Sequence, residues 1–217
     1  MNEKKNLTIE ETFALAVQNH KKNNFQVAEN LYKKILNTNP NSAGVHNNLG
    51  TMYKKLEEYQ KAISCYEKAI QINPNYVDAH NNLGNVLKEL GEYQKAKNCF
   101  QKAIQIQPNF ALAHNNLGAV LQELGEYQEA VLSYQKAINI QPNFAEAHSN
   151  LGAALQKLGE REKAISCYQE AIKIQPNNAD AHYNLGIVFK ELGEHQKAIA
   201  CYQKAIEINP NSPSAYN

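Results

Sequence analysis

The 217-residue sequence contains no tryptophan, only two methionines, and no apolar run close to the roughly 20 residues that a membrane-spanning helix requires. Its formal net charge is +1, so it lacks the basic excess that binding to nucleic acid demands. The opening stretch, MNEKKNLTIEE, lacks the apolar segment of a secretory signal. We therefore expect a cytoplasmic protein whose partner is neither a nucleic acid nor a membrane.

Cysteine is scarce, and its spacing argues against disulfides. The four cysteines lie 34, 68 and 34 residues apart, at Cys65, Cys99, Cys167 and Cys201. Because a disulfide requires Cα atoms within about 7 Å, equivalent points on stacked repeats should lie too far apart to pair. We expect four free thiols in a reducing compartment.

Common catalytic and phosphate-binding motifs are also missing. None of the stretches GxGxxG, GxxxxGK[ST], HExxH or GxSxG occurs in the sequence. The carboxylates are interleaved with lysine and glutamine, as on solvated helix faces. We accordingly expect a protein that is not an enzyme and that holds no cofactor.

Five histidines recur at one position of the repeat described next, at His46, His80, His114, His148 and His182. A zinc site needs nitrogen ligands about 2.0–2.1 Å from one centre, whereas neighbouring helices are about 8–10 Å apart. We therefore expect packing roles and no metal site. Protonation of these rings is expected to loosen the structure below about pH 6.

What the sequence contains instead is a unit of 34 residues that is copied in tandem. The third and fourth copies are identical at 24 of 34 positions. The copies span residues 9–42, 43–76, 77–110, 111–144, 145–178 and 179–212. We expect residues 1–8 to form a polar tail and residues 213–217 to begin a truncated seventh repeat or a cap. Tandem repetition at this period predicts an elongated array rather than a globule.

Each copy contains two helical patterns. In the third copy, apolar residues at intervals of three and four predict a helix over residues 79–90, which Gly91 should end in the left-handed conformation. A second stripe predicts a helix over residues 96–104, which should stop before Pro108. The asparagine after each such proline is the expected cap of the next helix. Because neither helix can bury its stripe alone, we predict an all-α fold, an α-solenoid of six helix-turn-helix repeats.

Three positions of the repeat carry expectations about packing and strain. Glu57 stands where later copies have glycine, so its backbone should be strained. Gly84 lies inside a helix, where glycine costs about 1 kcal/mol relative to alanine, and this suggests close helix approach. Phe100 should fill the space between repeats, and its truncation to alanine should cost roughly 3–5 kcal/mol if it is buried.

This pattern resembles the tetratricopeptide repeat (TPR). The resemblance is carried by Leu83, Gly84, Ala96, Phe100, Ala103 and Pro108 and by the same positions of the other copies. One departure is systematic: histidine stands where the family often has tryptophan. The resemblance implies a right-handed superhelix whose first helices line a concave groove that binds extended peptides or partner helices. The sequence of the repeat also resembles the arrays of O-linked N-acetylglucosamine transferases and related bacterial proteins, in which inner-helix asparagines contact the peptide backbone.

The positions that match those asparagines form what we call the ladder asparagines: Asn48, Asn82, Asn116, Asn150 and Asn184. A second row, the preceding asparagines, consists of Asn47, Asn81 and Asn115, and it is broken by Ser149 and Tyr183. A carboxamide offers two donors and an acceptor oxygen, so a row of them could clamp an extended backbone. The alternative is that these side chains bond only to their neighbours. We take all eight as candidate peptide-binding residues.

Three functions remain open at this point. The first is a non-enzymatic interaction scaffold that binds an extended peptide or partner segment. The second is the substrate-presenting arm of a larger modifying enzyme, such as a glycosyltransferase of the O-linked N-acetylglucosamine type. The third is a spacer, or a rod formed when two arrays stack end to end. Some tetratricopeptide domains bind acidic C-terminal tails with a set of lysines and arginines. We do not expect such a clamp here, because asparagine, serine or alanine stands at the positions that carry those cations in such domains.

Overall fold

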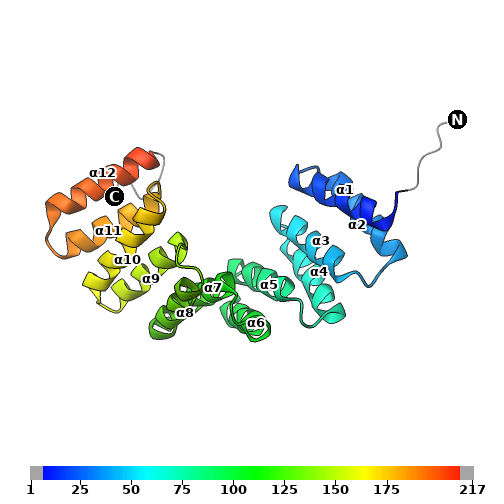
Figure 1. Ribbon diagram of the computed structural model, residues 1–217, viewed down its shortest axis with the longest axis horizontal. Coiled ribbons are helices and arrows are strands. Elements are labelled where there is room, and N and C mark those ends of the chain that lie inside the picture. The colour runs from blue at the N-terminus through cyan, green and yellow to red at the C-terminus, as the bar shows by residue number, and fades with distance from the viewer. Residues whose placement is uncertain (1–6, 211–217) are drawn as a thin grey trace. The chain divides into compact units, whose positions relative to one another are not determined.

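The computed structural model describes residues 7–210, which form twelve α-helices in six pairs (Figure 1). The helices are α1 (Ile9–Lys21), α2 (Phe25–Thr38), α3 (Ala43–Lys55), α4 (Tyr59–Ile72), α5 (Val77–Glu89), α6 (Tyr93–Ile106), α7 (Ala111–Glu123), α8 (Tyr127–Ile140), α9 (Ala145–Lys157), α10 (Arg161–Ile174), α11 (Ala179–Glu191) and α12 (His195–Ile208). The all-α fold and the helix-turn-helix repeats expected from the sequence are confirmed. The expected seventh repeat, residues 213–217, lies outside the described residues, as do residues 1–6 of the expected tail.

The chain divides into two compact units, residues 1–107 with α1–α6 and residues 108–217 with α7–α12. Within each unit the two helices of a repeat pack on each other, and repeats stack side by side in a solenoid-like array. First helices of neighbouring repeats touch: α1 with α3, α3 with α5, α7 with α9, and α9 with α11. Second helices make no comparable contact in the described part of either unit. We call the layer of first helices the inner layer and the second helices the outer layer.

A compact hydrogen-bonded turn ends each first helix. After α5, the Gly91 N–H donates to the Lys88 carbonyl at 3.0 Å, and the Glu92 N–H donates to the Leu87 carbonyl at 2.8 Å. These two bonds form a Schellman motif, which requires a positive φ at the residue after the helix. Gly91 supplies it with φ 75°. The expected role of this glycine is confirmed.

Two repeats build the same turn without glycine. Glu57 takes φ 59°, so the predicted backbone strain at this residue is confirmed. Asn23 takes φ 62° in the first repeat, and asparagine enters this region more readily than most residues. The turn geometry is therefore imposed by the repeat and not by its local residue.

The predicted helix caps are wrong by one position. After α4, the Tyr76 N–H donates to the Asn73 carbonyl at 3.0 Å and closes a turn with Pro74 and Asn75 at its centre. Asn75 is therefore held inside the turn, and Tyr76 is the residue that precedes the first helical position of α5. At the position equivalent to Tyr76, Asn178 does cap a helix, and its side chain accepts from the Ala181 N–H at 3.0 Å.

In the second to sixth repeats, a glycine of the first helix allows the two helices of the repeat to approach closely. A Cβ added at Gly84 would lie 2.7 Å from the Phe100 ring, and one at Gly50 would lie 2.6 Å from the Tyr66 ring. Both rings are completely buried. The aromatic side chain thus packs against the glycine of its own repeat. The first repeat has Ala16 at this position.

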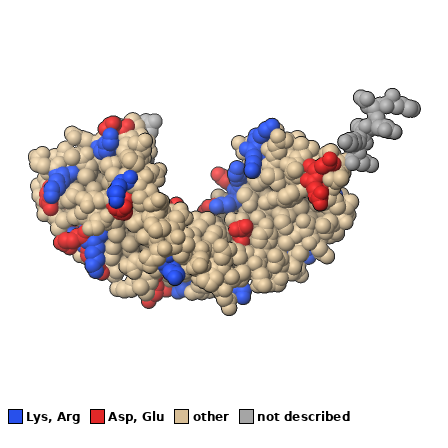
Figure 2. All heavy atoms as spheres, in the orientation of Figure 1, with Lys and Arg blue, Asp and Glu red and all other residues tan. Residues whose placement is uncertain are grey.

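Within the described residues, no helix is long and apolar enough to cross a membrane. Figure 2 shows basic and acidic side chains close together on the visible face of each unit, with wide areas that carry neither. Several ion pairs join residues three or four positions apart on one helix, such as Lys173 with Glu170 at 3.1 Å. Exposed pairs of this kind contribute little to stability.

Candidate functional site

The candidate asparagines all lie on first helices, so they belong to the inner layer of each unit. Asn47, Asn81 and Asn115 are buried, with 1–6% of their surface exposed. Among the ladder asparagines, Asn116 is buried, whereas the other four are half-buried. The ladder asparagines therefore offer more surface to a partner than the preceding asparagines do.

The two rows are joined by hydrogen bonds between repeats. In the first unit, Asn82 Nδ2 donates to Asn47 Oδ1 at 3.1 Å, and in the second unit Asn150 Nδ2 donates to Asn115 Oδ1 at 3.1 Å. Each bond links residues 35 positions apart. The amide of one repeat thus fixes the amide of the next, and these bonds tie first helices together. The alternative, that the asparagines bond to neighbouring side chains, therefore holds for one N–H of Asn82 and one N–H of Asn150.

The chain continues this network through a carboxylate in the second unit. Asn115 Nδ2 donates to Glu146 Oε1 at 3.0 Å, while its Oδ1 accepts from Asn150. Asn115 is 1% exposed, so its amide depends on these partners. Asn47 and Asn115 of the preceding row therefore hold the ladder asparagines Asn82 and Asn150 in place.

The ladder changes at its last step. Ser149 stands where the preceding asparagine is expected, and no hydrogen bond joins Ser149 to Asn184 in the described part of the chain. A pocket of about 630 Å³ opens here, between α9, the loop before α11, and α11 itself. Two ladder asparagines, Asn150 and Asn184, line it together with Tyr183. The sequence shows the break in the row, but the pocket is visible only once the helices are packed.

Charges near the C-terminal ends of the first helices pair between repeats. In the first unit Lys54 Nζ lies 2.7 Å from Glu89 Oε1. In the second unit Glu191 accepts from Gln156 Nε2 at 2.9 Å and from Arg161 Nε at 3.1 Å. Cations at these positions are engaged by carboxylates of the same unit. They are therefore poorly placed to clamp an acidic tail.

The recurring histidines hold the loop that precedes their helix. In five repeats the imidazole Nε2 lies 2.9–3.1 Å from the carbonyl of the proline six residues earlier. Since a carbonyl oxygen only accepts, Nε2 must carry the hydrogen. Protonation would add a hydrogen at Nδ1 and leave this bond in place. Among residues 7–210, no group of three potential ligands could hold a metal ion.

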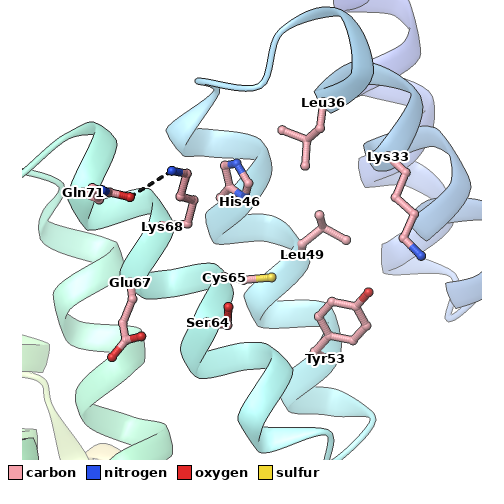
Figure 3. Close-up of a pocket in the computed structure, with 10 residues that line it drawn as sticks. All are labelled: Lys33, Leu36, His46, Leu49, Tyr53, Ser64, Cys65, Glu67, Lys68 and Gln71. Carbon is pink, nitrogen blue, oxygen red and sulfur yellow. Dashed lines mark hydrogen bonds between the residues drawn. The ribbon is translucent and has the colours of Figure 1, made fainter.

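A different surface, not anticipated from the sequence, lies on the outer side of the first unit. A cleft of about 630 Å³ lies between α2, α3 and α4. Figure 3 shows residues that line it, among them Leu36, Leu49, Tyr53 and Cys65. An equivalent cleft of about 430 Å³ follows between α4, α5 and α6 and includes Cys99. The clefts arise because second helices of neighbouring repeats are held apart by the first helix between them.

The four thiols are free and half-buried. Burial raises the pKa of Cys65, Cys99 and Cys167 to about 11 and also raises that of Cys201. Because the thiolate is the reactive form, these side chains are protonated and unreactive near neutral pH. Cys65 and Cys99 serve as small apolar groups in the two outer clefts.

Comparison with known proteins identifies the class of this array. Sequence models of the tetratricopeptide repeat match residues 31–64, 50–91, 84–125, 123–159 and 143–211. The chain belongs to the tetratricopeptide repeat family. No curated protein sequence matches it.

Several solved bacterial structures are similar to the chain. YrrB, a TPR protein with an unusual peptide-binding site, is 27% identical, with a TM-score of 0.68 over 85% of this chain and 95% of its own. MamA is 26% identical, with a TM-score of 0.68 over 77% of this chain and 92% of its own. PilF of Pseudomonas aeruginosa is 20% identical, with a TM-score of 0.84 over 95% of this chain and 94% of its own, and this likeness concerns the fold alone.

Proposed function

We propose that the chain is an interaction scaffold whose inner layer binds an extended segment of a partner protein through the ladder asparagines. The observation that carries the proposal is the fixed orientation of Asn82 and Asn150. Each uses one N–H to bond a preceding asparagine. The second N–H and the amide oxygen of each have no partner among the described residues. One donor and one acceptor are what the backbone of an extended peptide can satisfy.

Fixed amides favour such binding for an energetic reason. Side chains that are already ordered lose less conformational entropy when a partner binds than mobile ones do. The bonds to Asn47 and Asn115 impose that order before any peptide arrives. The likeness to YrrB supports the same role, since that protein has a peptide-binding site.

A selection experiment with random peptides tests the proposal. A phage-displayed library of random decapeptides is selected on the purified chain, and the peptides recovered are measured by fluorescence anisotropy. The test variant carries Asn82→Ala and Asn150→Ala. The matched control carries Asn98→Ala and Asn139→Ala, two exposed asparagines of the outer helices α6 and α8.

We expect the test variant to bind selected peptides about fivefold more weakly for each hydrogen bond lost, since a neutral bond contributes about 1 kcal/mol. The control should bind like the wild type. Equal affinity of the two variants, or a library that yields no binding peptide, would count against the proposal.

A second candidate is a substrate-presenting arm of a larger modifying enzyme, of the O-linked N-acetylglucosamine transferase type. It is favoured by the paired asparagines of α3, α5 and α7, because those transferases are expected to contact substrate backbone with the same positions. Sequencing the genomic reading frame around the repeats tests this role. A frame that continues into a glycosyltransferase domain would support it, and a stop codon close to the last repeat would oppose it.

A further inference from the structure

The pocket at the last step of the ladder differs from the rest of the inner layer in shape. At the step before it, Asn115 and Asn150 bridge α7 and α9 with a hydrogen bond. At this step the shorter Ser149 replaces asparagine, and the bridge to Asn184 is not made in the described part of the chain. Space of about 630 Å³ is left between the helices, and it is lined mostly by polar side chains.

The pocket also differs in charge. Two carboxylates, Glu146 and Asp180, line it, and none of its lining residues is lysine or arginine. Glu146 uses Oε1 to accept from Asn115, and no bond to its second oxygen occurs among the described residues. Asp180 has no ion-pair partner there either. By contrast, Glu191 farther along α11 is paired with Arg161.

The sequence places this combination at one junction only. Glu146 and Asp180 occupy the second position of the fifth and sixth repeats. No other two neighbouring repeats both have an acidic residue at this position. The same position is Gly44 in the second repeat and Leu112 in the fourth. The serine that opens the pocket occurs at this junction too.

We propose that this pocket receives a cationic side chain, arginine or lysine, from the peptide that the ladder binds. The inference rests on the proposed function and adds a chemical preference to it. The carboxylates of Glu146 and Asp180 and the amide oxygen of Asn184 accept hydrogen bonds, and an uncompensated negative charge attracts a cation. Tyr183 also lines the pocket, and its ring centroid lies 5.6 Å from that of Tyr202. An aromatic ring attracts a cation that lies over its face.

The test uses the same decapeptide library, with every peptide acetylated and amidated in the binding measurements. The pocket variant carries Glu146→Gln and Asp180→Asn, which keep size and hydrogen-bonding capacity; the glutamine oxygen introduced by Glu146→Gln can still accept from Asn115. Its matched control is Asp78→Asn, the same substitution at the equivalent position of the third repeat. Circular dichroism and thermal melting verify that each variant is folded.

We expect the selected peptides to share arginine or lysine at one position. The shared peptide should bind the pocket variant at least tenfold more weakly and the control within twofold of wild type. Replacing its arginine by citrulline, or its lysine by norleucine, should weaken binding to the wild type at least tenfold. A second variant, Ser149→Asn, should rebuild the bridge to Asn184, close the pocket, and remove the basic preference while selected peptides still bind.

The outcomes separate this inference from the function on which it rests. Peptides that depend on the ladder asparagines but share no basic position would overturn the inference and leave the scaffold function standing. The same follows if the pocket variant and Ser149→Asn keep the basic preference. A library that yields no ladder-dependent peptide would overturn both.

Discussion

The backbone of Glu57 offers a quantitative test of how the repeat imposes its turn. Glu57 has φ 59°, and its counterpart Gly91 has φ 75°, with no heavy atom within 4 Å of the place that a Cβ would take. Space is therefore not limiting, and only backbone conformation separates the two residues. A non-glycine residue in the left-handed region costs about 1–2 kcal/mol. Glycine loses more conformational entropy on folding, which costs about 0.4–1 kcal/mol and offsets part of the strain that glycine would relieve.

The net expectation is that Glu57→Gly stabilises the chain by about 1 kcal/mol and that Gly91→Ala destabilises it by about the same amount. For a chain of this size, about 1 kcal/mol corresponds to a shift in Tm of roughly 2–4 °C. Urea unfolding followed by circular dichroism measures the change in the free energy of unfolding for both variants. An unchanged slope of that free energy against urea concentration shows that the substitution altered stability alone. Glu57→Gln removes the charge but keeps the strain, so it should change little. An equal gain from Glu57→Gln and Glu57→Gly would refute the strain account.

Three further predictions concern packing, polar burial and acidity. Gly84→Ala should destabilise by about 1–3 kcal/mol, because its Cβ would lie 2.7 Å from the Phe100 ring; unchanged urea unfolding would contradict this. Asn115→Ala should cost about 1–3 kcal/mol by leaving the Asn150 amide and Glu146 without their partner, whereas Asn139→Ala on the outer surface should cost much less in the same assay. Burial, and to a smaller extent the charge of Lys55, lowers the pKa of His20 in the folded chain. The neutral ring therefore contributes its full stabilisation above the unfolded pKa of about 6.5, and the free energy of unfolding should fall as the pH drops below that value. His20→Gln should flatten that decline in thermal melts between pH 7.5 and 5, and an unchanged slope would show that another group causes it.

The sequence was most informative where structure depends on residues within one repeat. Helix spacing follows from the period of apolar residues, and the glycine turn follows from the conformational freedom of Gly91. The strain at Glu57 could be inferred because the turn is the same in every copy. The helix caps were misplaced because the turn after α4 takes Pro74 and Asn75 at its centre, a detail that composition does not reveal.

The candidate site was only partly predictable, for a physical reason. The row of asparagines is visible in the sequence, but the bond from Asn150 to Asn115 joins residues 35 positions apart and depends on how one repeat stacks on the next. Local periodicity carries no information about that contact. The same holds for the pocket beside Ser149, because a shorter side chain opens space only when the facing helix is held in place by the rest of the stack.

The central claim is that ladder asparagines bind the backbone of an extended peptide, and a double-mutant cycle tests it most directly. A selected peptide is synthesised with each amide in turn replaced by an ester, which removes one backbone N–H, and each version is measured against wild type and Asn150→Ala. At one position the two changes should be strongly non-additive, with a coupling of about 1 kcal/mol, because both delete the same hydrogen bond. Additive losses at every position of the peptide would contradict the claim.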